Sequence, residues 1–325
     1  MYFIFCRSGF NHGLGHLSRM INLGYQLHLK NQLVAFITNE ESLSVIPDRF
    51  FSVHAYGGNP TIQEMLYKSI VMYPESSDHV LIVDDKEVMD EDVRSIPWNL
   101  RACISIDNPA ANRDGRTYDL LVYPNAHMMD DEIYQSTTRF APGKVFHGSQ
   151  YVIMNHNLVK PRKISLKRPS VTLCAGGSDP DRYTKRLAPL MENLSSEWTF
   201  DVMAGELSGL NYRRFCHSIV EQCSIFICQW GVTVYEAMCV GTPVLTWTRN
   251  FRDFYRAKNL QKRSGGAIEV LPPDFSDADF VSCVQCLTCA DNRSQLAVMG
   301  ESGYHFIDNQ GSERVANVII QHTCG

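Results

Sequence analysis

Short apolar runs alternate with segments of helical periodicity along the whole chain. In the first half, apolar runs predict strands at residues 2–6, 33–38, 51–55, 80–83, 102–106 and 120–122. The spacing of apolar residues between these runs predicts helices over residues 17–30, 61–71 and 92–96. Strands that alternate with helices and are apolar along their whole length are typical of a parallel sheet covered on both faces. The pattern therefore predicts an α/β fold.

A second αβ series follows a polar segment at residues 158–169 that contains two prolines. Its predicted strands lie at residues 170–174, 199–203, 224–227, 244–246 and 267–270, and its helices at 182–192, 211–221, 232–240 and 254–263. The segment reads as an interdomain linker. We therefore expect domains at 1–157 and 170–325, an arrangement that allows the last helix to pack back on the first domain. A cleft between two such domains is a preferred small-ligand site.

Charge and composition narrow the class of protein. The chain has 325 residues, a net charge of −5 and an isoelectric point near 6.1. No basic stripe runs through it, so nucleic acid is not an expected partner. No apolar run approaches the ~20 residues of a transmembrane helix, and the first residues lack the pattern of a signal peptide. The eleven cysteines are then expected to be reduced thiols in the cytoplasm.

Three of these cysteines, Cys283, Cys286 and Cys289, repeat every third residue. The spacing places them along one side of a helix predicted near residues 277–288. A metal site usually needs four ligands, and no fourth ligand of matching spacing accompanies them. Because cysteine is among the most buried residue types, we favour a helix face packed in the core and expect no metal.

The most informative local pattern is a glycine-flanked histidine after the first strand. Gly13, Leu14, Gly15 and His16 lead from that strand into a helix, whose start can bind anions. His16 thus becomes a candidate acid/base group at the carboxyl edge of a parallel sheet. Asp84 follows another strand and could orient His16, bind a sugar, cap a helix or be solvated. For Asp107, before Asn108 and Pro109, we favour a turn.

Two turns in the second half have a binding and a structural interpretation. The run Gly176-Gly177-Ser178-Asp179-Pro180 can cradle a diphosphate on the free N–H groups of the following helix. It can equally be an αβ turn with Asp179 as N-cap. Further on, Gly231 to Thr233 open another helix, and Glu236 lies one turn in. Its carboxylate could accept hydrogen bonds from a ribose, or complete a capping box with Thr233.

Taken together, these turns resemble the PseG-type UDP-sugar hydrolases, relatives of the GT-B glycosyltransferases typified by MurG. The resemblance runs from residue 1 to about 270. Its motifs are Gly13-Leu14-Gly15-His16-Leu17-Ser18-Arg19, Ile106-Asp107-Asn108, Gly148–Met154, Gly176–Pro180 with Thr184, Gly231–Glu236, Gly241-Thr242-Pro243 and Asn250. No single motif is specific, but their order and spacing across two domains are.

The resemblance implies a GT-B fold of two Rossmann-like domains and a nucleotide-sugar substrate. His16 then matches the catalytic histidine that helps water attack the anomeric carbon and release UDP, and Asp84 is expected to be catalytic with it. No metal or other cofactor is expected. The nucleotide is expected at Gly177, Ser178, Gly231, Val232, Thr233, Glu236 and Asn250. Gly13, Gly15 and Arg19 are expected at the sugar or diphosphate.

One departure from the family leaves the acceptor open. The family commonly has Asp-His-Tyr where this chain has Asp84-Asp85-Lys86, and the segment 125–141 is long. With an enlarged acceptor pocket, the same site would transfer the sugar to an acceptor molecule, and the protein would be a glycosyltransferase. A second alternative is a catalytically silent nucleotide-sugar binding protein. A Rossmann dehydrogenase is disfavoured, because Gly13-Leu14-Gly15 lacks the third glycine and the following acid.

Overall fold

The computed structural model describes residues 1–9, 13–58, 60–73, 78–96, 100–108, 110–112, 115–140, 143–158, 169–191, 197–205 and 208–324. The chain forms two compact units. Unit 1 comprises Met1–His156 and Gln310–Gly325, and unit 2 comprises Asn157–Asn309. Most of the segment expected to be a linker, residues 159–168, lies outside the described residues. None of the helices in the described part is both long and apolar enough to cross a membrane.

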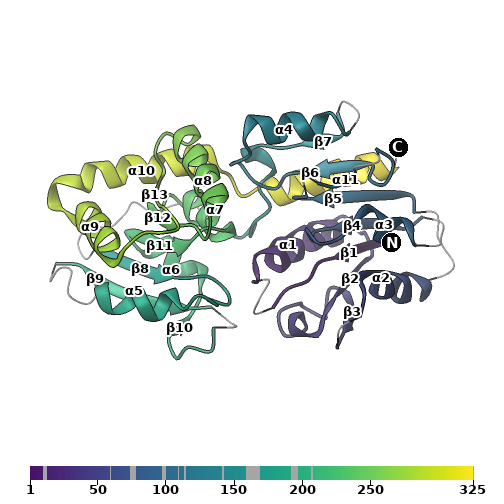
Figure 1. Cartoon of the computed structure of the whole chain (residues 1–325), viewed down its shortest axis with the longest axis horizontal. Helices are drawn as coiled ribbons and strands as arrows, with labels where there is room; N and C mark the ends of the chain where they lie inside the picture. The colour runs from purple at the N-terminus through teal and green to yellow at the C-terminus, as the bar shows by residue number, and fades with distance from the viewer. Residues whose placement is uncertain are drawn as a thin grey trace. The chain divides into compact units, whose positions relative to one another are not determined.

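Unit 1 is built on a parallel sheet in the order β3-β2-β1-β4-β5-β6-β7 (Figure 1). Its strands are β1 (Tyr2–Phe5), β2 (Val34–Asn39), β3 (Ser52–Tyr56), β4 (Val80–Val83), β5 (Ala102–Ile106), β6 (Leu120–Val122) and β7 (Val145–Phe146). Its helices are α1 (Gly15–Leu29), η1 (Glu40–Ser42), α2 (Ile62–Val71), α3 (Asp90–Arg94), α4 (Asp130–Thr137), η2 (Ser149–Tyr151) and α11 (Gly311–Cys324). All of these strand pairs are parallel, as predicted.

Two apolar cores cover the two faces of this sheet. On one face, Ile4 and Phe36 pack with Leu23 of α1 and Ile319 of α11. On the other face, Phe3 and its neighbours pack against α2. Alternate residues of each strand point to opposite faces, so a strand buried on both must be apolar throughout. Helix α11, whose sequence lies far from the rest of unit 1, completes the first of these cores.

Unit 2 repeats the plan with the sheet order β10-β9-β8-β11-β12-β13. Its strands are β8 (Ser170–Cys174), β9 (Thr199–Ala204), β10 (Arg213–Arg214), β11 (Ile225–Gln229), β12 (Val244–Trp247) and β13 (Ile268–Leu271). Its helices are α5 (Tyr183–Met191), α6 (His217–Gln222), α7 (Val232–Cys239), α8 (Phe251–Arg263), α9 (Asp277–Thr288), η3 (Ala290–Asn292) and α10 (Arg293–Phe306). The predicted parallel α/β fold is thus confirmed in both halves of the chain.

The expected helix over residues 211–221 is wrong in its first half. Arg213 and Arg214 instead form the edge strand β10, paired in parallel with Met203 and Ala204. Only the short α6 remains helical. Apolar spacing cannot reveal this edge strand, because it consists of two exposed arginines and contains no apolar residue. The elements β7, α4 and α10 had no counterpart in the predicted ranges.

The cysteine face of α9 also differs from expectation. Cys283 packs against the core of unit 2. Cys286 and Cys289, however, are exposed, and Cys289 is the C-cap of the helix. Three residues advance a helix by 300°, so successive members of the series rotate out of the buried face. The packed-face interpretation therefore holds for Cys283 alone.

Each sheet has a point where the strand order reverses direction. In unit 1 the reversal falls between β1 and β4, and in unit 2 between β8 and β11. Ligands of open α/β sheets bind outside the carboxyl ends of the strands at such points. The loops that follow these four strands are accordingly where each unit is best suited to hold a functional site.

Candidate functional site

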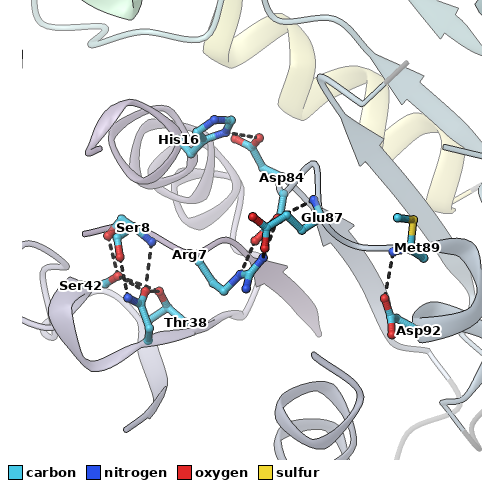
Figure 2. A network of polar contacts seen from close by, with 11 residues as sticks. Arg7, Ser8, His16, Thr38, Ser42, Asp84, Glu87, Met89 and Asp92 are labelled. Carbon is cyan, nitrogen blue, oxygen red and sulfur yellow. Dashed lines mark hydrogen bonds and ion pairs between the residues drawn. The ribbon is translucent and has the colours of Figure 1, made fainter. Parts of the chain in front are cut away.

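His16 and Asp84 meet at the reversal point of the first sheet. His16 is the second residue of α1, which begins directly after Leu14, and Asp84 follows β4. Their side chains face each other, with 2.8 Å between His16 Nδ1 and Asp84 Oδ1 (Figure 2). Asp84 is fully buried, whereas the His16 side chain is 28% exposed. The imidazole is therefore held on its Nδ1 side and reaches the surface.

Asp84 is also the partner of a buried arginine on the same helix. Arg19 lies one turn after His16, and its Nε and Nη2 donate to the two oxygens of Asp84. Burial alone would raise the pKa of Asp84, but Arg19 and His16 lower it below its usual value. Asp84 is thus an anion at neutral pH. His16 Nδ1 has two polar neighbours, Asp84 Oδ1 at 2.8 Å and Arg19 Nη2 at 2.9 Å. Because Arg19 Nη2 already donates to Asp84 and a carboxylate only accepts hydrogen bonds, we assign the proton of the imidazole to Nδ1.

Arg19 extends this network to the next strand of the sheet. Its Nη1 donates to Asp107 Oδ2 at 3.0 Å, and Asn125 Nδ2 donates to Asp107 Oδ1 at 2.9 Å. Burial would raise the pKa of Asp107, but Arg19 and, more weakly, Lys86, His127 and His16 hold it well below its usual value. Arg19 was expected at the sugar or diphosphate. The structure instead buries its guanidinium between two carboxylates.

Asp107 combines the turn expected of it with a second role. Its backbone φ of +55° is left-handed, a conformation that Asp tolerates better than most residues. Its carboxylate, however, joins Arg19 to Asn125. No local sequence signal separates these roles, because Arg19 comes from α1 and Asn125 from the loop after β6.

The triplet that departs from the family pattern is divided between two ion-pair groups. Asp85 accepts from Arg7 Nε at 2.6 Å, and Arg7 also pairs with Glu87. Lys86 is 54% exposed, and its Nζ lies 3.8 Å from Asp107 Oδ2. Lys86 therefore brings an exposed positive charge to the network around His16. Figure 2 shows Arg7 and Glu87 beside Asp84.

The glycines before α1 are placed differently from each other. Gly13 has a φ of +75°, and its N–H donates to the carbonyl of Gly9. This bond occupies the group that was expected to meet a sugar or diphosphate. Gly15 is exposed and begins α1, so its backbone remains a candidate contact. Below this loop, Ser8, Thr38 and Ser42 form a buried hydroxyl network that anchors the end of β1 (Figure 2).

In unit 2, some of the N–H groups that were expected to bind a diphosphate are already hydrogen-bonded within the protein. Helix α5 begins at Tyr183, and the Asp179 carboxylate accepts from the N–H groups of Tyr183 and Thr184 at 2.8 and 2.9 Å. The free helix N-terminus predicted after Pro180 is therefore wrong. Asp179 does satisfy the first N–H groups of α5, but it lies four residues before Tyr183 and is not the N-cap residue that was expected. Gly177 is half-buried and Ser178 buried in the same turn, so only the turn itself remains for a ligand.

Helix α7 keeps an open start. It begins at Val232 directly after Gly231, as predicted, and no side chain caps it. Thr233 lies inside the helix, so the capping box between Thr233 and Glu236 is excluded. Glu236 is buried, and its Oε1 lies 3.2 Å from His217 Nε2. Val232 and Thr233 thus place uncapped N–H groups beside the loop after β11.

His217, at the start of α6, was missed by the sequence analysis. Burial would lower its pKa, but Glu236, with smaller effects of Cys216 and Glu221, raises the pKa above its usual value. No sequence pattern could have paired it with Glu236, since the two residues come from different helices. The pair places an imidazole at ion-pair distance from the carboxylate that was expected to meet a ribose, although His217 Nε2 makes no hydrogen bond of good geometry.

The loop after β12 holds the last expected nucleotide ligand. Asn250 is the N-cap of α8, where its Oδ1 accepts from the N–H of Asp253 at 2.9 Å. Its amide nitrogen contacts the Asp253 carboxylate. The side chain thus has a structural role at the edge where the family resemblance places the diphosphate.

Within the described residues, no three His, Cys, Asp or Glu side chains converge as metal ligands would. The groups of the two units that could take part in chemistry are the side chains and backbone groups named above. In unit 1 these are an imidazole, two carboxylates and two cations. In unit 2 they are a glycine turn, an open helix start and a buried carboxylate.

No protein-family model and no curated protein matches the sequence. Solved structures with similar folds do exist. MurG of Acinetobacter baumannii is 12% identical with a TM-score of 0.64, covering 98% of this chain and 99% of that chain. Anabaena HepE in complex with UDP-glucose is 12% identical, with a TM-score of 0.66 and the same coverage. The spinosyn forosaminyltransferase SpnP is 13% identical, with a TM-score of 0.66, covering 100% and 99%.

These likenesses extend over nearly the whole chain and therefore include both sheets. At such low identity they show the fold alone. The chain has the GT-B fold, with two Rossmann-like parallel-sheet units. The fold class implied by the sequence motifs is thus confirmed.

Proposed function

We propose that the chain is an enzyme that hydrolyses a UDP-sugar at its anomeric carbon, as PseG-type hydrolases do. The observation that carries the proposal is the 2.8 Å contact between His16 Nδ1 and Asp84 Oδ1 at the reversal point of the first sheet. With its proton on Nδ1, the imidazole keeps a lone pair on Nε2. A partly exposed imidazole held in this way is suited to accept a proton from water.

In the proposed reaction, the oxygen of water forms a bond to the anomeric carbon while His16 Nε2 takes one of its protons. The bond between that carbon and the diphosphate oxygen breaks, and its electron pair leaves with UDP. Asp84 stabilises the imidazolium that forms. Arg19 keeps Asp84 ionised and fixed, so the acid/base pair requires no rearrangement during the reaction.

Unit 2 supplies the proposed nucleotide-binding groups. The open start of α7 at Val232 and Thr233 offers N–H donors to phosphate oxygens. Glu236 offers a buried carboxylate to the ribose hydroxyls, and the half-buried turn at Gly177 offers backbone donors. The likeness to HepE, whose structure contains UDP-glucose, supports this choice of nucleotide.

A glycosyltransferase is the second candidate function. It is favoured by Lys86, which stands in place of the family's aromatic residue and adds a positive charge beside Asp107. The likeness to the forosaminyltransferase SpnP also supports it. In that reaction an acceptor hydroxyl replaces water, and His16 takes the proton of that hydroxyl.

Incubation with a panel of UDP-sugars separates these functions. Hydrolysis predicts equal amounts of UDP and free sugar without any acceptor. Release of UDP only when an acceptor is added would support transfer instead. Calorimetry that finds no binding of UDP or any UDP-sugar would overturn both proposals.

A further inference from the structure

Arg249 lies two residues after the end of β12, at the carboxyl edge of the second sheet, and belongs to none of the expected sites. Its Nε lies 2.7 Å from Asp181 Oδ2. The same Nε lies 2.6 Å from the side-chain oxygen of Gln229, with the amide oriented so that its nitrogen donates to the carbonyl of Ala175 at 2.9 Å. This orientation satisfies both ends of the amide. Two acceptors thus hold one edge of the guanidinium.

The opposite edge of that guanidinium is not engaged. Arginine has five N–H donors, and Asp181 and Gln229 together contact only the one on Nε. Among the described residues, no hydrogen bond from either terminal nitrogen of Arg249 is found, and the side chain is 42% exposed. A guanidinium fixed at Nε and open at its terminal nitrogens presents a planar fork, which matches two oxygens of a phosphate.

The clamp places this fork beside the glycine turn after β8. Asp181 belongs to that turn, and Gln229 ends β11, the strand next to β8. A Cβ built on Gly176 would lie 3.7 Å from the side-chain amide of Gln229, at the end that donates to Ala175, so the amide rests against the turn. Arg249 therefore lies at the reversal point of the second sheet, close to the loop that precedes α7.

The charges of this edge explain why a cation is needed there. The start of α5 is already occupied by the Asp179 carboxylate, so it cannot bind the diphosphate. Asp181 adds a second negative charge to the turn, and Arg249 pairs with it. Backbone N–H groups alone would have to hold a diphosphate against these carboxylates. A guanidinium with free donors supplies the missing positive charge.

We propose that Arg249 binds the diphosphate of the nucleotide through its terminal N–H groups, with Gln229 and Asp181 as positioning residues. This rests on the proposed function, because a UDP-sugar brings a diphosphate to this edge. Asn250, which the sequence motif offered as the ligand at this loop, remains the cap of α8.

The test compares the binding of UDP and of uridine by the full chain, measured by calorimetry or competition. Arg249→Gln should weaken the binding of UDP about 10- to 100-fold, because a charged hydrogen-bonded pair is lost, while the binding of uridine is unchanged. Arg249→Lys should recover only part of the loss, since it keeps the charge without the fork. Arg213→Gln, on the exposed edge strand β10, is the control for losing one positive charge.

The positioning role of Gln229 is tested by a second variant. Gln229→Met should weaken the binding of UDP in the wild-type background and have no further effect on it when combined with Arg249→Gln. A general structural role of Gln229 would not produce this dependence on Arg249. If wild type binds UDP and Arg249→Gln binds it equally well, the proposal for Arg249 is overturned while the proposed function stands. An equal loss for uridine and UDP also overturns it. If the wild type binds neither compound, the proposed function itself fails.

Discussion

At the scale of single residues, the site in unit 1 depends on how one carboxylate is shared. Asp84 accepts from Arg19 on both oxygens and faces His16 on one of them. The arginine keeps the carboxylate ionised, and the carboxylate sets the tautomer of the histidine. Acid/base chemistry at His16 therefore depends on a buried ion pair that does not itself reach the solvent.

Replacing His16 tests the proposed chemistry directly. His16→Ala should lower turnover at least about 100-fold, because the general base is removed, and should leave UDP affinity within a few-fold of wild type. His28→Ala, an exposed histidine on the same helix, is the matched control. Turnover and UDP binding are measured on the same preparations. Normal turnover in His16→Ala would remove His16 from the mechanism.

The Glu236–His217 pair predicts a measurable shift in one titration. Glu236 raises the pKa of His217 against the effect of burial, so Glu236→Gln should lower the His217 pKa, as followed by NMR of the ring protons. Because the folded-state pKa is raised, the pair stabilises the fold fully below pH 6.5. This contribution is lost as pH rises through the raised value. An unchanged titration would contradict the pairing.

Glu236 should also determine how well the site distinguishes ribose from deoxyribose. If its carboxylate meets the ribose diol, wild type should prefer UDP over 2′-deoxy-UDP, and Glu236→Gln should lose most of that preference. Affinities of both nucleotides are measured for both proteins. A preference that persists unchanged in the variant would show that another group contacts the diol. Loss of stability with unchanged affinities would indicate a purely structural role.

At the scale of elements, α5 and α7 show two outcomes of the same sequence signal. Both helices follow glycine-containing turns after central strands. In α5 an acidic side chain folds back on the first N–H groups, whereas α7 starts after Gly231 without a side-chain cap. The first N–H groups of a helix can bind a ligand only where no side chain of the protein already accepts hydrogen bonds from them.

This contrast predicts the behaviour of Asp179 variants. Asp179→Ala should destabilise the fold by about 1–2 kcal/mol, because its hydrogen bonds to the first N–H groups of α5 are lost and Ala replaces Asp at a φ of +45°. Asp179→Asn should lose less, since Asn accepts a hydrogen bond and tolerates this conformation. UDP affinity should not fall in either variant. A marked loss of UDP affinity in Asp179→Ala at unchanged stability would contradict this assignment.

At the scale of the whole molecule, unit 1 is built from two segments of the chain that are separated in sequence by the whole of unit 2. The chain leaves unit 1 after His156, builds unit 2, and returns to unit 1 with α11. There Val315, Ala316 and Ile319 join the core that also contains residues of β1 and α1. Tyr2 Oη and Thr323 Oγ1 add a buried hydrogen bond of 2.8 Å between the two ends. Unit 1 is therefore complete only when the last helix is in place.

A substitution in the last helix should consequently weaken unit 1. Ile319→Ala should cost about 2–5 kcal/mol, because a fully buried side chain is removed from its core. Hydrogen exchange should accelerate in β1 and β4 and stay unchanged in β8 and β11. Val298→Ala, on the exposed face of α10, is the control and should change neither. Faster exchange confined to unit 2 in Ile319→Ala would contradict this account.

The sequence predicted the strands best where burial is complete. The ranges 80–83, 102–106, 120–122 and 170–174 match β4, β5, β6 and β8 as observed, because a strand covered on both faces must be apolar throughout. The helix expected from residue 254 begins at Phe251 instead, since Asn250 caps it through a side-chain bond. The edge strand β10 escaped prediction, because it consists of two exposed arginines and contains no apolar residue.

By itself, the sequence determined the two αβ series, the turns at the strand ends and the position of His16 after β1. Those features follow from local periodicity and from residues within one turn of each other. Only the tertiary structure decided that Arg19 is buried between Asp84 and Asp107, that Glu236 faces His217, and that Arg249 is clamped by Gln229. These contacts join residues far apart in the chain, so their partners depend on strand order and register rather than on any local pattern.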